Sequence, residues 1–209
     1  MNKLLKTLGK YWYIKIVATI VILLFPLIVS GLSSASYIVL LGCFILVYIV
    51  AVSGLDILFG YCGQISLGHA GFFAIGAYGS AILNKISGIP PLLTALIACI
   101  AASLIAAVIA FPAAKLKFHF LSLATIAFGE IMYSLISASP GNITGNFVGY
   151  FPNKMSIFGL ELNNYTYFFY FALIIVTIAL IVKQNIVKSR TGRSFVAIRE
   201  NVTAAMVWV

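Results

Sequence analysis

The sequence predicts an all-α membrane protein, in which several helices cross the bilayer as a polytopic bundle. Of its 209 residues, 63% are hydrophobic and only 8% are charged, whereas about a quarter of the residues of a soluble domain are charged. The mean hydropathy is +1.13. The apolar residues also form separate runs, several of them near the ~20 residues that a transmembrane helix needs. These three observations exclude an ordinary soluble domain.

The first two predicted spans are bounded by interface and turn residues. Residues 14–31 follow several lysines and the aromatic cluster 11–13, a combination typical of a membrane interface. Pro26 lies inside this span and is expected to kink it. A short polar turn leads to the second span, residues 37–53, which ends where a glycine-rich sequence begins.

Four further spans follow the glycine-rich sequence. The third, residues 69–83, is rich in small residues, and a loop with two prolines separates it from the fourth, residues 92–114. A basic break precedes the fifth span, residues 120–138, and a long Gly-, Pro- and Asn-rich loop precedes the sixth, residues 165–182. Residues 1–182 therefore form the predicted membrane domain.

A glycine-rich segment, residues 54–68, lies between the second and third spans. Glycine is unfavourable inside a helix, and non-helical backbone at membrane depth persists only where protein buries it or where it lines a wet cavity. We predict a broken or re-entrant segment, with a short cytoplasmic loop as the alternative. Candidate residues of a translocation pathway or a structural motif are Gly60, Gly63, Gln64, Ser66, Gly68, His69 and Gly76. His69 either titrates or forms hydrogen bonds at a helix start.

Small residues recur at helical spacing in two adjacent spans. Such stripes let helices approach closely, which drives association in a membrane. We therefore expect the third and fourth spans to pack inside the bundle. The stripes are Ala70, Ala74, Ala77 and Ala81 in the third span, and Ala98, Ala102, Ala106, Ala110 and Ala114 in the fourth.

Glu130 is the acidic residue of the fifth span. A charged side chain in the bilayer centre costs about 2.5–3.5 kcal/mol on insertion scales, so Glu130 is predicted to face the bundle interior rather than lipid. Three roles stay open: a buried acid satisfied by serine, backbone or water, a partner of the irregular backbone near Gly63, or a contact to substrate or to another subunit.

Residues 183–209 form a basic, amphipathic segment. Phe195, Ile198, Val202 and Ala205 form an apolar stripe at helical spacing. A helix of this kind suits either a groove on a partner protein or the membrane surface.

Charge distribution predicts the topology. If both ends of a six-span chain lie in the cytoplasm, every Lys and Arg except Lys85 and Lys154 falls in a cytoplasmic segment, as the positive-inside rule requires. Residues 139–164 are then predicted to lie outside. The basic residues flank apolar runs, so the net charge of +9 does not indicate nucleic-acid binding.

No catalytic, metal-binding or cofactor-binding motif occurs in the sequence. There is no HExxH, GxSxG or phosphate-binding loop. Cys43, Cys62 and Cys99 form no CxxC pair and are interpreted as small packing residues. We therefore predict a protein that is not an enzyme and holds no cofactor.

Three segments resemble the LivM-type permeases of branched-chain amino-acid ABC transporters. They are GYCGQISLGHAGFFAIGAYGSAIL from residue 60, LATIAFGEI in the fifth span, and KSRTGRSFVAIRENVTAA in the tail. The resemblance implies a bacterial inner-membrane subunit that helps to form the pathway for leucine, isoleucine and valine. It also implies a second homologous permease, two ATPase subunits that hydrolyse the ATP, and an extracellular or periplasmic amino-acid-binding protein.

The resemblance further implies that the tail contacts an ATPase subunit. The matching residues are Gly192, Arg193, Ala197, Ile198, Arg199, Glu200, Ala204 and Ala205. The family pattern continues with a glycine and further spans, which predicts a C-terminally incomplete permease. The alternatives are a compact six-span variant, an importer of urea or short amides, a non-functional remnant, and a membrane enzyme using Glu130 and His69.

Overall fold

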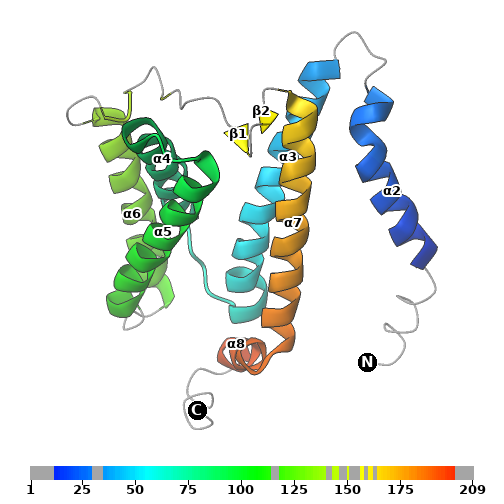
Figure 1. The fold of residues 1–209 in the computed structure, drawn as a ribbon. Coiled ribbons are helices and arrows are strands. Elements are labelled where there is room, and N and C mark those ends of the chain that lie inside the picture. Colours follow the sequence, from blue (N-terminus) through cyan, green and yellow to red (C-terminus); the bar gives the residue numbers. More distant parts are fainter. Residues whose placement is uncertain are drawn as a thin grey trace.

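The protein is helical over most of its length in the computed structural model (Figure 1). The structure describes residues 12–29, 35–113, 118–139, 143–145, 150, 156–157, 160–161 and 164–200. Its elements are α2 (Trp12–Val29), α3 (Ala35–Asp56), the π-helix η1 (Ile57–Cys62), α4 (His69–Ser87), α5 (Pro91–Ala113), α6 (Phe118–Ala138), β1 (Ser156–Ile157), β2 (Leu160–Glu161), α7 (Tyr165–Lys188) and α8 (Arg190–Glu200).

Each predicted span coincides with one of the helices α2 to α7. Within the described part of the chain, four helical stretches are long and apolar enough to cross a membrane: Ser36–Cys62, Pro91–Ala113, Phe120–Ala138 and Tyr165–Lys188. A shorter apolar helix, Ile20–Val29, belongs to α2. The predicted polytopic helical bundle is confirmed, and the number of six crossings stays a prediction.

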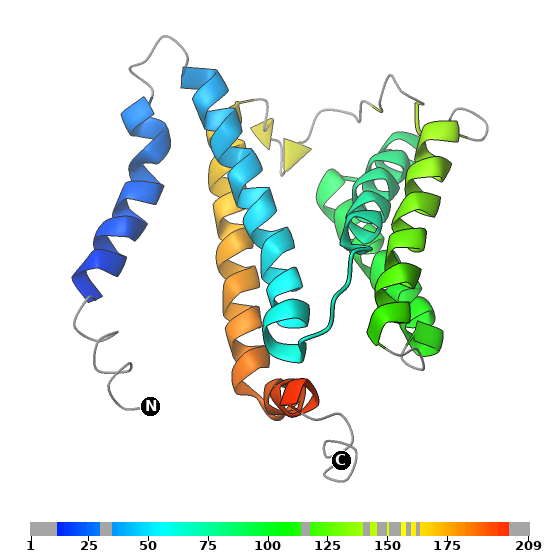
Figure 2. The ribbon, with the colours of Figure 1, turned by 180° about the vertical axis from the view of Figure 1, so that it is seen from behind.

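The helices lie in two groups, as Figures 1 and 2 show. In the first group α3 and α7 lie side by side and parallel, α2 lies beside them, and α8 lies across the end of α7. The buried core of this group includes Cys43 and Leu46 of α3 and Val176 of α7. The rings of Phe25 and Phe169, 5.5 Å apart between centroids, join α2 to α7.

The second group consists of α4, α5 and α6 (Figure 1). A methyl group built on Gly79 of α4 would lie 3.6 Å from the Cβ atom of Ala98, and Ala98 is buried. The close helix contact expected from the small-residue stripes is therefore present between α4 and α5. It does not extend along the whole of either stripe, since Ala77 and Ala110 are exposed.

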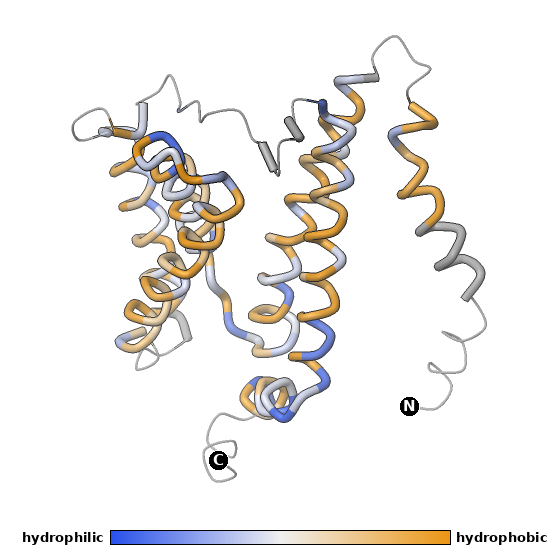
Figure 3. Tube along the Cα trace, viewed as in Figure 1, coloured by the Kyte–Doolittle hydropathy of each residue, from blue (hydrophilic) through white to orange (hydrophobic). Residues whose placement is uncertain are grey.

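Polar residues gather at one end of the bundle, which we call the α8 end. Figure 3 shows hydrophobic residues along α3 and α7, and hydrophilic ones where α7 ends, in α8 and in the segment after η1. Lys183 and Lys188 belong to the last turns of α7, while Lys85 belongs to the last turn of α4, at the opposite end. The predicted difference in charge between the two sides of the membrane thus corresponds to a difference between the two ends of the bundle.

One helix boundary differs from the prediction. The second span was expected to end at residue 53, but α3 continues through Gly54 to Asp56, and η1 extends the helical run to Cys62. One glycine costs a helix only about 0.5–1 kcal/mol, so the packing of α3 on α7 overrides it. The long loop before α7 contains an antiparallel hairpin in which Ser156 pairs with Glu161.

Candidate functional site

The glycine-rich segment contains a sharp turn at Gly63. Gly63 closes η1 in the left-handed conformation, with φ 67° and ψ 15°, which a residue without a Cβ atom adopts at little cost. Its backbone N–H donates to the carbonyl oxygen of Leu58, and that of Gln64 donates to the same oxygen at 3.0 Å. Single π-helical turns are frequent at functional sites.

Residues 63–68, which we call the linker, are not helical and pack against α6. The backbone N–H of Leu67 donates to Thr125 Oγ1 at 3.1 Å, and Ser122 Oγ donates to the carbonyl oxygen of Ile65 at 3.2 Å. A side chain on Gly68 would come within 2.8 Å of the Thr125 carbonyl oxygen. Two side chains of α6 therefore satisfy linker backbone groups that regular structure would otherwise pair.

The linker runs beside α6 rather than beyond its end. Figures 1 and 2 show that it rises from the α8 end and that α4 begins part-way along α6. His69, the first residue of α4, places its ring against Gly54 of α3, where a methyl group would lie 3.4 Å from His69 Cε1. The predicted broken segment is thus present, and its end contacts both groups of helices.

Arg199 of α8 contacts the start of the linker. Its Nη1 atom donates to the carbonyl oxygen of Gly60 at 2.8 Å, in the last turn of η1, where carbonyl groups lack partners within the helix. Its Cγ atom lies 2.9 Å from the position that a Cβ atom on Gly63 would occupy. Arg199 therefore contacts the turn in two ways. Its guanidinium group makes a charge-assisted hydrogen bond, and the stem of its side chain packs beside Gly63.

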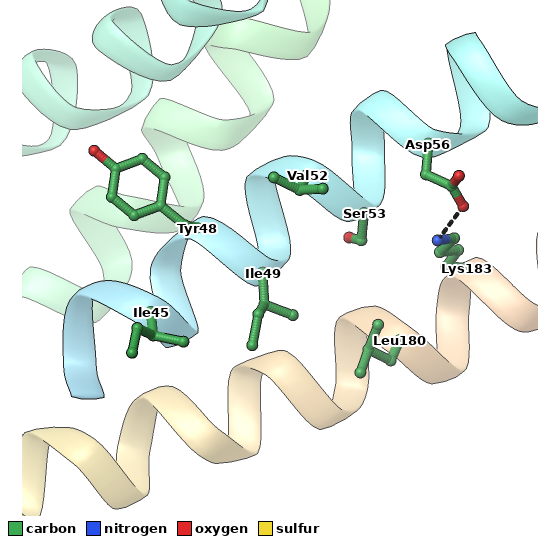
Figure 4. A pocket seen from close by; sticks show the side chains of 8 residues that line it. All are labelled: Ile45, Tyr48, Ile49, Val52, Ser53, Asp56, Leu180 and Lys183. Atoms are coloured by element: carbon green, nitrogen blue, oxygen red, sulfur yellow. Dashed lines mark hydrogen bonds and ion pairs between the residues drawn. The ribbon is translucent and has the colours of Figure 1, made fainter. Parts of the chain in front are cut away.

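An ion pair holds the opposite side of η1 to α7. Lys183 Nζ lies 2.6 Å from Asp56 Oδ2 (Figure 4). The other carboxylate oxygen, Oδ1, lies 2.7 Å from where a methyl group on Gly60 would be, so the carboxylate covers this glycine. The pair closes one end of an apolar groove of about 490 Å³ between α3 and α7.

The helix α8 has an inward and an outward face. Phe195 and Ile198 are half-buried on the inward face, and Gly192 is buried. A Cβ atom on Gly192 would overlap the carbonyl oxygen of Val187, so this glycine lets α8 fold back on the end of α7. The outward face, which is exposed, consists of Arg193, Val196, Ala197 and Glu200.

The comparison with known families decides the assignment. The family described as branched-chain amino acid transport system / permease component matches residues 36–208. The chain belongs to this family. It is a polytopic membrane protein, as its apolar helices require.

Two curated relatives of this permease-family chain are proteins described as high-affinity branched-chain amino acid transport system permease protein LivM. The one from Salmonella typhimurium (strain LT2) is 28% identical over 181 residues, and the one from Escherichia coli (strain K12) is 29% identical over 181 residues. Each match covers 75% of this chain and 42% of the relative, so the chain spans less than half the length of these relatives. No solved structure matches the chain.

Some of the candidate residues of this permease-family chain come together, and others do not. Gly60, Gly63 and Arg199 meet at one junction. The side chains of Gln64 and Ser66 are half-buried in the linker. Gly76 has open space beside it among the described residues. Ala204, Ala205 and the Val202 of the predicted stripe lie outside the described residues.

Glu130 does not face the interior of this chain, and its place in the assembled bundle stays a prediction. Its side chain is exposed on α6 and makes no hydrogen bond within the part of the chain that the structure describes. Thr125 and Ser122, one to two turns earlier on α6, bond to the linker instead. The spacing of two hydroxyl residues at i and i+3 in an apolar span was the signal that sequence reasoning missed.

Proposed function

We propose that this chain is the permease subunit of an ATP-binding-cassette importer for branched-chain amino acids and forms part of its translocation pathway. The observation that carries the proposal is the family match over residues 36–208. The two curated relatives, both described as LivM permease proteins of branched-chain amino acid transport, also support the proposal. The sequence holds no phosphate-binding loop, so separate ATPase subunits would hydrolyse the ATP.

The proposed assembly contains a second homologous permease, two ATPase subunits and a binding protein outside the membrane. The outward face of α8 suits an ATPase subunit, because its apolar Val196 and Ala197 lie between the charged Arg193 and Glu200. Within residues 183–209, the proposed coupling segment begins after α7, since Lys183 and Lys188 belong to the membrane helix α7.

The pathway would lie along the linker and the exposed face of α6. Glu130 lies on that face, and a charge left in lipid is costly, which favours a water-filled or protein-covered surface there. A Glu130→Gln variant keeps hydrogen-bonding capacity, whereas Glu130→Leu removes it. We expect Gln to retain more uptake than Leu, and equal uptake by both variants would contradict this placement.

The test of function is reconstitution with partner subunits from the same organism. Proteoliposomes that contain this chain, a second permease, the ATPase subunits and the binding protein are assayed for ATP-dependent uptake of radiolabelled leucine and of urea. We expect leucine uptake that disappears when this chain or ATP is omitted. Uptake of urea alone would reassign the substrate, and uptake of neither would refute the proposal.

The orientation that we propose places the N-terminus and α8 in the cytoplasm of a bacterial inner membrane. Ile86, in the last turn of α4, and Lys188, at the end of α7, are both exposed and belong to opposite ends of the bundle. In a background without native cysteines, an impermeant maleimide should label Ile86→Cys on intact spheroplasts but Lys188→Cys only after lysis. The reverse pattern would invert the topology.

A further inference from the structure

Arg199 lies where a movement of α8 would reach the linker. The helix α8 is joined to α7 through the single non-helical residue Ser189, with φ −75° and ψ 179°. Gly192 packs against the end of α7 near that joint. Arg199 lies at the other end of α8, one residue before its last, so it would move furthest if α8 turned about Ser189.

The contact that Arg199 makes uses both its guanidinium group and the stem of its side chain. The hydrogen bond to the Gly60 carbonyl oxygen, 2.8 Å long, reaches the C-terminal end of η1, where the helix dipole favours a positive charge. The stem of the side chain occupies the space left by the missing Cβ atom of Gly63. A lysine would keep the charge but would lack the planar guanidinium group.

The two ends of the linker are held by different elements. Its first residue, Gly63, touches Arg199 of α8, and its later residues bond to α6 through Leu67 and Ile65. The ion pair Asp56–Lys183 ties the other side of η1 to α7. A shift of α8 would therefore act on the turn at Gly63 while α6 and α7 hold the surrounding backbone.

We propose that Arg199 is a positioning residue that transmits movement of α8 to the turn at Gly60–Gly63 and so to the linker and α4. This inference rests on the proposed function, in which the outward face of α8 receives the ATPase subunit. Arg199 is not counted in that face, because it contacts Gly60 and Gly63, so its role is to carry the movement to the turn. The linker, which lacks regular hydrogen bonds, is the part of the pathway that would change shape.

The first experiment compares coupling in reconstituted complexes. Arg199→Ala and Arg199→Lys are tested against Arg190→Ala, an exposed arginine of the same helix. We expect Arg199→Ala to co-purify with its partners and hydrolyse ATP as the wild type does. Leucine transported per ATP should fall about tenfold, the effect of losing one charge-assisted hydrogen bond. Arg199→Lys should restore part of the ratio, and Arg190→Ala should leave it unchanged.

The second experiment uses a native cysteine of η1 as the reporter. Cys62 is half-buried beside the turn, and Cys43 and Cys99 are replaced by alanine. Maleimide labelling of Cys62 is timed with and without ATP and orthovanadate. We expect ATP and orthovanadate to change the labelling rate at least about twofold in the wild type, and this change to disappear in Arg199→Ala.

Several results would overturn the inference. They are an unchanged transport ratio in Arg199→Ala, an equal loss in Arg190→Ala, and a loss explained wholly by poor assembly. A Cys62 labelling rate that ignores nucleotide in the wild type, or still responds to it in Arg199→Ala, would overturn it as well. If the wild-type complex transports no leucine, the proposed function fails, and the nucleotide response of Cys62 still decides the role of Arg199.

Discussion

Replacing Gly68 by alanine should disrupt the contact between the linker and α6. Gly68 has φ −87° and ψ 5°, which alanine adopts without strain, so the effect is purely steric. The added methyl group would lie 2.8 Å from the carbonyl oxygen of Thr125 and 3.3 Å from Phe128 Cδ1. Backbone atoms cannot rotate away as a side chain can, so the linker itself must move.

The expected cost follows from the loss of close packing. Overpacking of a filled site costs about 1–3 kcal/mol, and a shift of the linker would also weaken the hydrogen bond from Leu67 to Thr125. The matched control is Gly76→Ala in α4, where no described atom lies within 4 Å of the added methyl group. Alanine is favoured over glycine in a helix by about 0.8–1 kcal/mol, so this variant should be slightly stabilised.

The assay is the free energy of unfolding of the purified chain, from denaturant titration in mixed micelles followed by helical circular dichroism. We expect Gly68→Ala and Gly76→Ala to differ by about 2–4 kcal/mol, with the first less stable than the wild type. If Gly68→Ala is as stable as Gly76→Ala, the linker does not pack on α6 as described.

Three further predictions test the same junction by the same unfolding measurement. Asp56→Ala and Lys183→Ala should each destabilise by about 1 kcal/mol, and the double variant by little more, because the pair is lost once; strictly additive losses would mean that the ion pair contributes nothing. Thr125→Val should cost about 1 kcal/mol by leaving a linker amide unpaired, while Thr177→Val, whose hydroxyl bonds only within its own helix, should cost less; equal losses would contradict the bond to the linker. Gly63→Ala should cost about 1–2 kcal/mol for the left-handed backbone alone, and an unchanged stability would show that the turn is absent.

The sequence predicts the helices well because membrane spans depend mainly on length and apolarity. The starts of α4 and α7 are predicted at the residues where the structure has them, His69 and Tyr165. Apolar runs bounded by prolines, glycines or basic residues leave little freedom at such positions. The ends are predicted less well, since α7 continues past residue 182 to Lys188 through polar residues that remain helical at the membrane surface.

The contacts of the junction are beyond sequence reasoning because they join distant segments. Arg199 and Gly60 are 139 positions apart, and Lys183 and Asp56 are 127 positions apart. Read along the chain, Asp56 is an isolated acid and Lys183 is one of several basic residues after a span. Only the parallel packing of α3 and α7, which end on the same side of the bundle, brings the two charges together at the α8 end.

The glycines of the motif also show why composition alone misplaces a break. Gly63 is the one that needs a left-handed backbone, and the helical run ends there rather than at Gly54. Gly60 stays helical and leaves room for the Asp56 carboxylate, whereas Gly68 lets the linker touch the backbone of α6. Each of these glycines meets a different element, so their density reflects several close contacts that converge on one junction. A substitution at each glycine should therefore disrupt a different contact. The linker is the place where α3, α6 and α8 meet.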